Sequence, residues 1–297
     1  MFKNQQLTGH LAATITVFIW GITFISTKVL LEDLEALEIL ITRFVIGLIA
    51  LKIISPHFVK AKEWKHELYM ILAGLCGVTL YFLCENLALT LEYASNVCVI
   101  TSIAPFFTAL LSFVLMKEEK PNKYFFLGFV IAITGICLIS YNGQANLGIN
   151  PLGTLLAVFA PIVWAFYSIL IKKLSTFGYN TTQMTARIFF YGIIFMIPAT
   201  FFFDCSWDFA TFLKPVNLLN LLFLGLCASA LCYNSWNYAI RVLGAIKTTI
   251  YIYAMPVVTV IISIIVLNEN ITLMATIGII CTILGLFLSE GKLFLKK

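Results

Sequence analysis

Ten runs of about 20 apolar residues follow one another along the 297 residues of this chain, with short polar segments between them. A helix of about 20 apolar residues crosses the roughly 30 Å hydrocarbon layer of a membrane. With 61% hydrophobic and only 11% charged residues, the chain has too little polar surface for a soluble globular protein. The expected spans lie near residues 11–31, 36–54, 67–89, 95–116, 123–141, 152–172, 182–203, 216–240, 247–267 and 272–290.

Each run is expected to be a helix, because an open strand in lipid leaves backbone groups without hydrogen-bond partners. The runs also lack the alternation of polar and apolar residues that membrane barrels show. The first run is longer than the core of a signal peptide and contains Trp20 and Lys28, so we expect it to be a retained span. The sequence therefore predicts an all-α integral membrane protein with ten transmembrane helices.

Basic residues gather on one side of the expected spans. If the N-terminus is cytoplasmic, that side receives Lys60, Lys62, Lys65, Lys117, Lys120, Lys123, Lys172, Lys173, Arg241 and Lys247. The other side holds almost only Lys214 and carries acidic residues such as Glu32, Asp33 and Glu35. Cytoplasmic loops of membrane proteins are enriched in Lys and Arg. We therefore expect a multi-pass protein of the cell membrane, in a bacterial inner membrane, with both termini in the cytoplasm.

A proline lies 13 residues before a glutamate in two apolar stretches, which pair Pro105 with Glu118 and Pro256 with Glu269. The two glutamates fall at opposite edges of the membrane, so we interpret them as helix-end residues. Proline removes a backbone donor from a helix and permits a kink. Pro105 and Pro256 are therefore the candidate hinges.

The repeat extends over the whole chain. A shift of 144 residues takes Trp20 to Trp164, and a shift of 151 residues takes Gly74 to Gly225. We expect two units, 1–143 and 144–297, and refer to them as the first and second half. Five spans in each half is an odd number, so the second half must be inverted relative to the first. Many transporters are built from inverted repeats, with the substrate site near the midplane between them.

The repeated blocks also carry a resemblance to a known family. They are the WGITF block at Trp20, the segment 88–119, its second copy 239–269, and the paired glycines Gly128, Gly135, Gly278 and Gly285. In these features the sequence resembles the EamA-like transporters of the drug/metabolite transporter superfamily, over nearly its whole length. One departure is Lys117 and Asn268 where the family usually has glycine before the motif glutamate. The resemblance implies transport of amino acids, other metabolites or toxic compounds, often outward.

Ionisable and amide side chains inside the spans are candidate site residues, because they are costly in lipid. Glu85 is interpreted as a proton or substrate-amine site, or as a structural partner for Arg43 or for a helix of the other half. Arg43 and Arg187 correspond in the repeat; they would bind carboxylates on the two sides of the membrane or cap helix ends. Asn86 and Asn237 also correspond, and would line a cavity or join helices.

Aromatic side chains near these positions suit a partly wet pocket for an apolar or zwitterionic solute. The candidates for substrate binding are Tyr81, Tyr233, Trp164 and Tyr167, with packing as the alternative. For the paired glycines, close packing of helices is the main interpretation and a homodimer contact is the alternative.

Known catalytic signatures do not occur in the sequence. The eight cysteines have no C-x-x-C spacing, and H-E-x-x-H, G-x-S-x-G and phosphate-binding glycine loops are missing. We expect no enzyme activity, metal, cofactor or nucleic-acid partner. The sequence predicts a secondary transporter that exports small organic metabolites such as amino acids by alternating access, driven by a proton or solute gradient. The alternative is a membrane scaffold or lipid-modifying protein.

Overall fold

The computed structural model describes residues 2–116, 123–141, 150–203, 205–268 and 272–289. Within these ranges every element of regular secondary structure is a helix, which confirms the all-α prediction. Glu118, Glu269 and Lys117 lie outside the described residues, as does most of the polar segment that joins the two halves.

The first half contains the five expected spans. They are α1 (Phe2–Leu30), α2 (Ala36–Ile54), α3 with η1 and α4 (Trp64–Gly74, Leu75–Leu80, Tyr81–Leu91), α5 with α6 (Ala94–Thr101, Ala104–Met116) and α7 (Lys123–Tyr141).

The second half repeats this order. Its spans are α8 (Pro151–Ser175), α9 with η2 (Thr181–Met196, Pro198–Phe201), α11 with η3 and α12 (Pro215–Leu222, Phe223–Leu231, Cys232–Leu243), α13 with η4 and α14 (Ala245–Thr249, Ile250–Ala254, Met255–Val266) and α15 (Leu273–Ser289). The short helix α10 (Phe209–Phe212), in the loop before α11, was not expected from the sequence.

Seven of the described spans are long and apolar enough to cross a membrane by length and composition. The other three are α2, which contains Glu38, Arg43 and Lys52, and α7 and α15, whose apolar stretches in the described residues are shorter. Glu38 and Arg43 of α2 are buried, whereas Ile49 and Ile53 of the same helix are exposed, so α2 turns these two charges toward the bundle interior.

Capping side chains set several helix boundaries. The side chain of Asn150 accepts hydrogen bonds from the first turn of α8, directly before Pro151, and Asn180 caps α9 in the same manner. Gly244 separates α12 from α13 with φ of 86°, a backbone conformation that side chains with a Cβ rarely adopt.

Several spans are interrupted at matching places. The π-helices η1 and η3 lie in the third and eighth spans, and the shift of 151 residues superimposes η1 on the end of η3. The fourth span breaks between α5 and α6, and the ninth contains the 3-10 helix η4. Pro105 and Pro256 are the second residues of α6 and α14, directly after these breaks, where a missing N–H leaves no bond unmade. Their movement as hinges stays a prediction.

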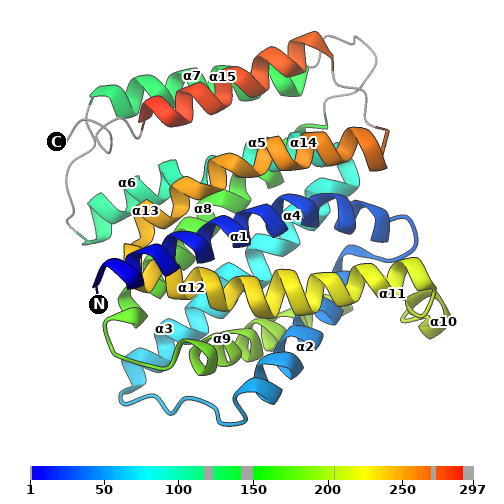
Figure 1. The fold of residues 1–297 in the computed structure, drawn as a ribbon. Helices are drawn as coiled ribbons and strands as arrows, with labels where there is room; N and C mark the ends of the chain where they lie inside the picture. The colour runs from blue at the N-terminus through cyan, green and yellow to red at the C-terminus, as the bar shows by residue number, and fades with distance from the viewer. Residues whose placement is uncertain (1, 117–122, 142–149, 204, 269–271, 290–297) are drawn as a thin grey trace.

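The helices form one elongated bundle, with α7 and α15 side by side along one face (Figure 1). A Cβ on Gly135 would lie 2.5 Å from the carbonyl oxygen of Gly278, and one on Gly285 would lie 2.5 Å from that of Gly128. These glycines therefore let α7 and α15 approach closely within the chain, which supports helix packing as their role. The homodimer contact stays a prediction.

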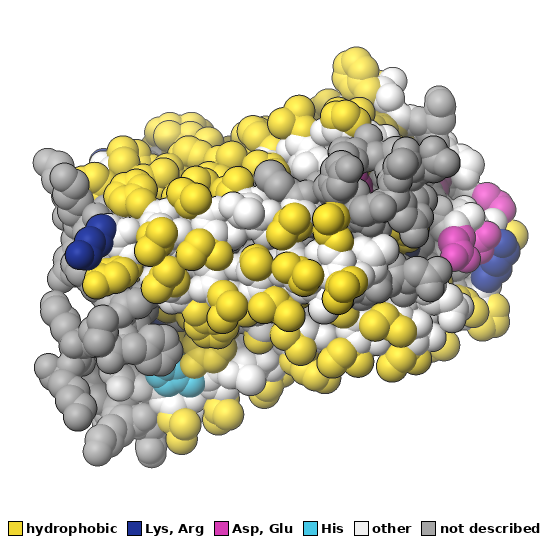
Figure 2. Space-filling view, turned by 90° about the horizontal axis from the view of Figure 1, so that it is seen from above, with side chains coloured by type: hydrophobic (Ala, Val, Ile, Leu, Met, Phe, Trp, Pro, Cys, Tyr) yellow, Lys and Arg dark blue, Asp and Glu magenta, His cyan; other side chains and the backbone are white. Residues whose placement is uncertain are grey.

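Side chains along the bundle surface are mostly hydrophobic, and the charged ones visible in Figure 2 lie near its ends. This distribution suits a bundle that crosses lipid. We call the end at which α1, α3 and α9 begin the N-terminal end, and the end at which α2, α8 and α11 begin the far end (Figure 1).

Candidate functional site

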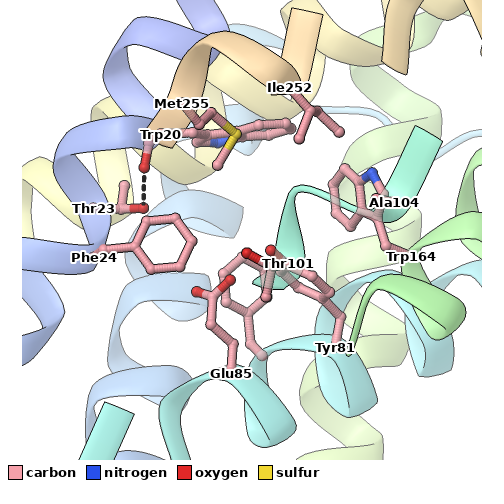
Figure 3. A pocket seen from close by; sticks show the side chains of 11 residues that line it. Trp20, Thr23, Phe24, Tyr81, Glu85, Thr101, Ala104, Trp164, Ile252 and Met255 are labelled. Atoms are coloured by element: carbon pink, nitrogen blue, oxygen red, sulfur yellow. Dashed lines mark hydrogen bonds between the residues drawn. The ribbon is translucent and has the colours of Figure 1, made fainter. Parts of the chain in front are cut away.

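A small cavity lies in the interior between the two halves (Figure 3). Its walls come from α1, α4, α8 and the two interrupted spans, the fourth and the ninth. The residues that line it are Trp20, Thr23, Phe24, Tyr81, Phe82, Glu85, Thr101, Ala104, Trp164, Ile252 and Met255.

Matching positions of the two halves meet around this cavity. Three pairs of lining residues correspond under the shifts of 144 and 151 residues: Trp20 with Trp164, Thr101 with Ile252, and Ala104 with Met255. The last two pairs stand directly at the breaks in the fourth and ninth spans. The cavity therefore lies where the inverted halves face each other, the usual place of a substrate site in such folds.

Among the described residues that line the cavity, only Glu85 has an acidic or basic side chain. The residue is 2% exposed, and its carboxyl group points from α4 toward Phe24 of α1, beside the hydroxyl of Tyr81 (Figure 3). A carboxylate in apolar surroundings can bind an ammonium group or take up a proton.

Aromatic contacts fix the walls of the cavity. The Trp20 and Trp164 rings meet edge to face with centroids 5.3 Å apart, and the Tyr81 centroid lies 4.9 Å from that of Trp164. Trp20 Nε1 donates a hydrogen bond of 3.0 Å to the carbonyl of Ala228 in η3. Trp164 Nε1 has no hydrogen-bond partner among the described residues. One tryptophan thus joins the halves by a polar bond, and the other keeps a donor free.

The cavity is narrow in this conformation. Its volume is about 20 Å³, which is room for about one water molecule. An organic metabolite can occupy this place only after side chains or helices move apart.

The predicted amides do not line the cavity. Asn86 donates to the carbonyl of Ala36 at 3.1 Å and so joins α4 to α2. Asn237 accepts from the Tyr167 hydroxyl at 2.7 Å and donates to Thr185 Oγ1 at 2.9 Å, which joins α12, α8 and α9. Both amides are buried and bond between helices in this conformation.

Tyr233 also serves a neighbouring helix. Its hydroxyl donates to the carbonyl of Gly77 in the π-helix η1, and its ring lies behind Trp20 and Trp164, with centroids 5.7 and 5.8 Å away. Tyr233 therefore supports the cavity wall without facing the space inside it.

Arg43 is fully buried in α2, behind the cavity wall. Its guanidinium carbon lies 4.3 Å from the ring centroid of Phe82, which lines the cavity, and its Nε donates to Ser229 Oγ at 3.2 Å. The two terminal nitrogens have no hydrogen-bond partner among the described residues. The repeat-related Arg187 differs, because its Nη2 and Nε lie 2.8 and 2.9 Å from Glu67 Oε1 in α3.

Three of the nine predicted binding residues, Glu85, Tyr81 and Trp164, therefore line the cavity. The sequence reasoning missed the other lining residues, including Thr101 and Met255 at the breaks. The signal that could have identified them is the repeat itself, since matched positions in the first and sixth and in the fourth and ninth spans converge here. A binding role for Arg43, Arg187, Asn86, Asn237, Tyr167 and Tyr233 stays a prediction.

In the part of the chain that the structure describes, no three His, Cys, Asp or Glu residues lie close enough together to hold a metal ion.

A sequence model of the EamA-like transporter family matches residues 7–141 and 151–290. An uncharacterized transporter of Archaeoglobus fulgidus is 29% identical over 297 aligned residues, which cover 95% of this chain and 97% of that protein. The uncharacterized transporter YetK of Bacillus subtilis is 23% identical, over 97% of this chain and 88% of that protein. A solved crystal structure superimposes with a TM-score of 0.67 at 16% identity, over 95% and 98% of the two chains.

Proposed function

We propose that this chain, which belongs to the EamA-like transporter family, is a secondary transporter that exports small organic metabolites bearing an amino group, such as amino acids. Ten spans in two five-helix repeats fit this family, and a multi-pass membrane transporter implies a small-molecule substrate within a lipid bilayer. The observation that carries the finer proposal is the single carboxylate, Glu85, in an aromatic cavity between the inverted halves.

The chemistry of the cavity suggests how transport is coupled. An ammonium group and a proton both neutralise the carboxylate of Glu85, and they compete for it because a single carboxylate holds only one of them at a time. Exchange of an amine for a proton follows from this competition. The sequence contains no nucleotide-binding motif, so a gradient is the proposed energy source.

Alternating access between the halves is the proposed mechanism. The cavity has room for about one water molecule, so substrate binding requires the surrounding helices to move apart, and in alternating access one end of the bundle opens at a time. The distribution of lysine and arginine supports the proposal that the N-terminal end faces the cytoplasm of a bacterial cell.

The test is solute flux into proteoliposomes that contain the purified protein. The panel pairs each amine or amino acid with the analogue that lacks the amino group, and flux is measured with and without a pH gradient. We expect saturable, gradient-dependent flux for amino compounds only. Glu85→Gln should abolish it while the protein stays folded, whereas Asp208→Asn, at an exposed carboxyl in the loop before α11, should transport normally.

Three results would contradict the proposal. Saturable flux of the analogues without an amino group would remove the amine as the recognised group. Unchanged pH dependence in the Glu85→Gln variant would remove Glu85 from the coupling. No saturable flux for any solute would favour the alternative, a membrane scaffold or a lipid-modifying protein.

A further inference from the structure

Contacts between the two halves close the N-terminal end of the bundle at the first turn of α3. The ring of His66 stacks on Phe177, with centroids 3.7 Å apart and an interplanar angle of 17°. His66 Nδ1 also lies 2.7 Å from the hydroxyl of Tyr179, which accepts a hydrogen bond from the backbone N–H of Lys62. Phe177 and Tyr179 belong to the loop between α8 and α9, so these contacts join the first half to the second. We call this set the aromatic latch.

A different set of contacts closes the far end, at the first turn of α11. Asp33, in the loop between α1 and α2, accepts hydrogen bonds from Asn217 Nδ2 at 2.9 Å and from Lys214 Nζ at 3.0 Å. These contacts again join the two halves. The carboxylate carries the charge that Lys214 balances. We call this set the charged latch.

The two latches occupy corresponding positions in the inverted repeats. The shift of 151 residues takes His66 to Asn217, and the shift of 144 residues takes Asp33 to Phe177. In the stacked pair, His66 thus corresponds to Asn217 and Phe177 corresponds to Asp33 of the hydrogen-bonded pair. In each case the third residue of a helix that begins the third or eighth span touches the loop that follows the first or sixth span. The repeat has conserved the place of contact while the chemistry of the two pairs differs.

Further contacts strengthen each end. At the N-terminal end, Glu67 follows His66 in α3 and pairs with Arg187 of α9. At the far end, Glu38 of α2 accepts a hydrogen bond of 2.7 Å from the backbone N–H of Trp207. Contacts therefore join the two halves at both ends in this conformation, and the cavity between the two ends is small.

We propose that the aromatic latch and the charged latch are the two gates of the transport cycle, and that each must break for its own end to open. This inference rests on the proposed function, in which the ends open in turn. A contact that exists only while an end is closed favours the conformation open at the opposite end. Weakening one latch therefore shifts the population toward the state open at the weakened end and closed at the other.

Hydrogen exchange of the purified protein, measured by mass spectrometry, tests this shift because exchange reports the population of open states. Asp33→Asn weakens the charged latch. We expect roughly threefold to tenfold faster exchange in residues 31–35 and 205–217. The discriminating result is slower exchange at the opposite end, in residues 62–66 and 176–180. Tyr179→Phe and Phe177→Ala weaken the aromatic latch, so exchange should be faster in residues 62–66 and 176–180 and slower in residues 31–35 and 205–217. Asp33→Asn and Tyr179→Phe are conservative substitutions, so the test stands even if Phe177→Ala does not fold.

Matched controls separate a gate from a local contact. Asp208→Asn removes a carboxylate at the far end that caps α10 within the second half. Phe212→Ala removes a ring stacked on Trp207 within the same loop. Neither contact joins the halves, so neither control should slow exchange at the N-terminal end. In the double variant Asp33→Asn with Tyr179→Phe, the ratio of the exchange rates at the two ends should return toward the wild-type ratio.

Exchange that rises only near the substituted residue, or that rises at both ends, would overturn the proposal that the two latches are gates. The experiment needs no substrate, so its outcome is independent of the flux assay. Opposite responses of the two ends without any solute flux would retain the gates and reject the proposed transport of amines.

Discussion

Trp20 and Trp164 hold matching positions in the two halves, and their rings meet edge to face at the cavity with centroids 5.3 Å apart. The two indoles nevertheless differ in their polar contacts. Trp20 Nε1 donates to the buried carbonyl of Ala228, whereas Trp164 Nε1 has no partner among the described residues. The symmetry of the repeat places both rings, and the local surroundings give only one of them a hydrogen bond across the halves.

This difference predicts unequal effects of the same substitution. Trp20→Phe and Trp164→Phe remove similar volumes from the same cavity wall, but only Trp20→Phe breaks a buried hydrogen bond. We expect the free energy of unfolding in detergent to fall by about 1–3 kcal/mol more for Trp20→Phe than for Trp164→Phe. Denaturant unfolding followed by tryptophan fluorescence would measure it. Equal losses would show that the bond to Ala228 contributes nothing.

The repeat-related arginines should also respond differently to methionine. Arg43 is fully buried, its terminal nitrogens have no hydrogen-bond partner among the described residues, and the buried carboxylate of Glu85 is the largest opposite charge that acts on its guanidinium. Arg43→Met therefore leaves Glu85 buried without that positive charge. We expect the free energy of unfolding of this variant to fall by about 3 kcal/mol, because removal of one of two interacting buried charges leaves the other unbalanced. Arg187→Met leaves Glu67 without its ion pair, and because that pair is partly exposed we expect a loss of about 1–2 kcal/mol.

Thermal or denaturant unfolding of both variants checks this contrast. Flux through Arg43→Met is the second readout. If the variant is as stable as wild type but does not transport, Arg43 serves the transport cycle and does not stabilise the fold, whereas the expected loss of stability would show that its charge balances the buried Glu85.

The bond between Asn237 and Tyr167 predicts energetic coupling. Asn237→Ala leaves the hydroxyl of Tyr167 unpaired in the interior, whereas Thr185 Oγ1 keeps its bond to the carbonyl of Thr181, and Tyr167→Phe removes the Tyr167 hydroxyl. In a double-mutant cycle we expect a coupling free energy of about 1 kcal/mol or more between Asn237→Ala and Tyr167→Phe. The wild-type side chain of Asn86 bonds to α2 and not to Tyr167. In the matched cycle, the effects of Asn86→Ala and Tyr167→Phe should therefore be additive within about 0.5 kcal/mol.

The sequence predicted the helices and the repeat well, because span length and the positions of Trp20, Pro105 and their partners depend on local chemistry. It also located Glu85, since a carboxyl in an apolar run has few roles. Which polar groups face the cavity depends on helix rotation and on breaks in the spans, and these follow from tertiary packing. Asn86 is adjacent to Glu85 in the sequence, yet it points to α2, because adjacent residues of a helix face different directions.

The breaks themselves had no clear sequence signal beyond the prolines. The π-helices η1 and η3 contain ordinary apolar residues, and the 3-10 turn η4 reads IYIYA. Intrinsic helix propensity does not separate these segments from the helices around them. The latches were missed for another reason: a contact between residues more than 100 positions apart, such as His66 with Phe177, leaves no local pattern in either segment.

The charged latch predicts a dependence of stability on pH. Hydrogen bonds from Asn217 and Lys214 hold the pKa of Asp33 below its ordinary value of 3.8. A carboxyl group whose pKa is lower in the folded protein stabilises it above pH 3.8, and this contribution disappears as the pH falls through the lower, folded-state pKa. Asn at this position cannot titrate. The melting temperature of wild type should therefore exceed that of Asp33→Asn by a constant amount from about pH 7 to about pH 5, and the difference should shrink below pH 3.8. A difference that is already lost near pH 6, or that persists unchanged to pH 2, would show that ionised Asp33 does not hold this end of the bundle closed.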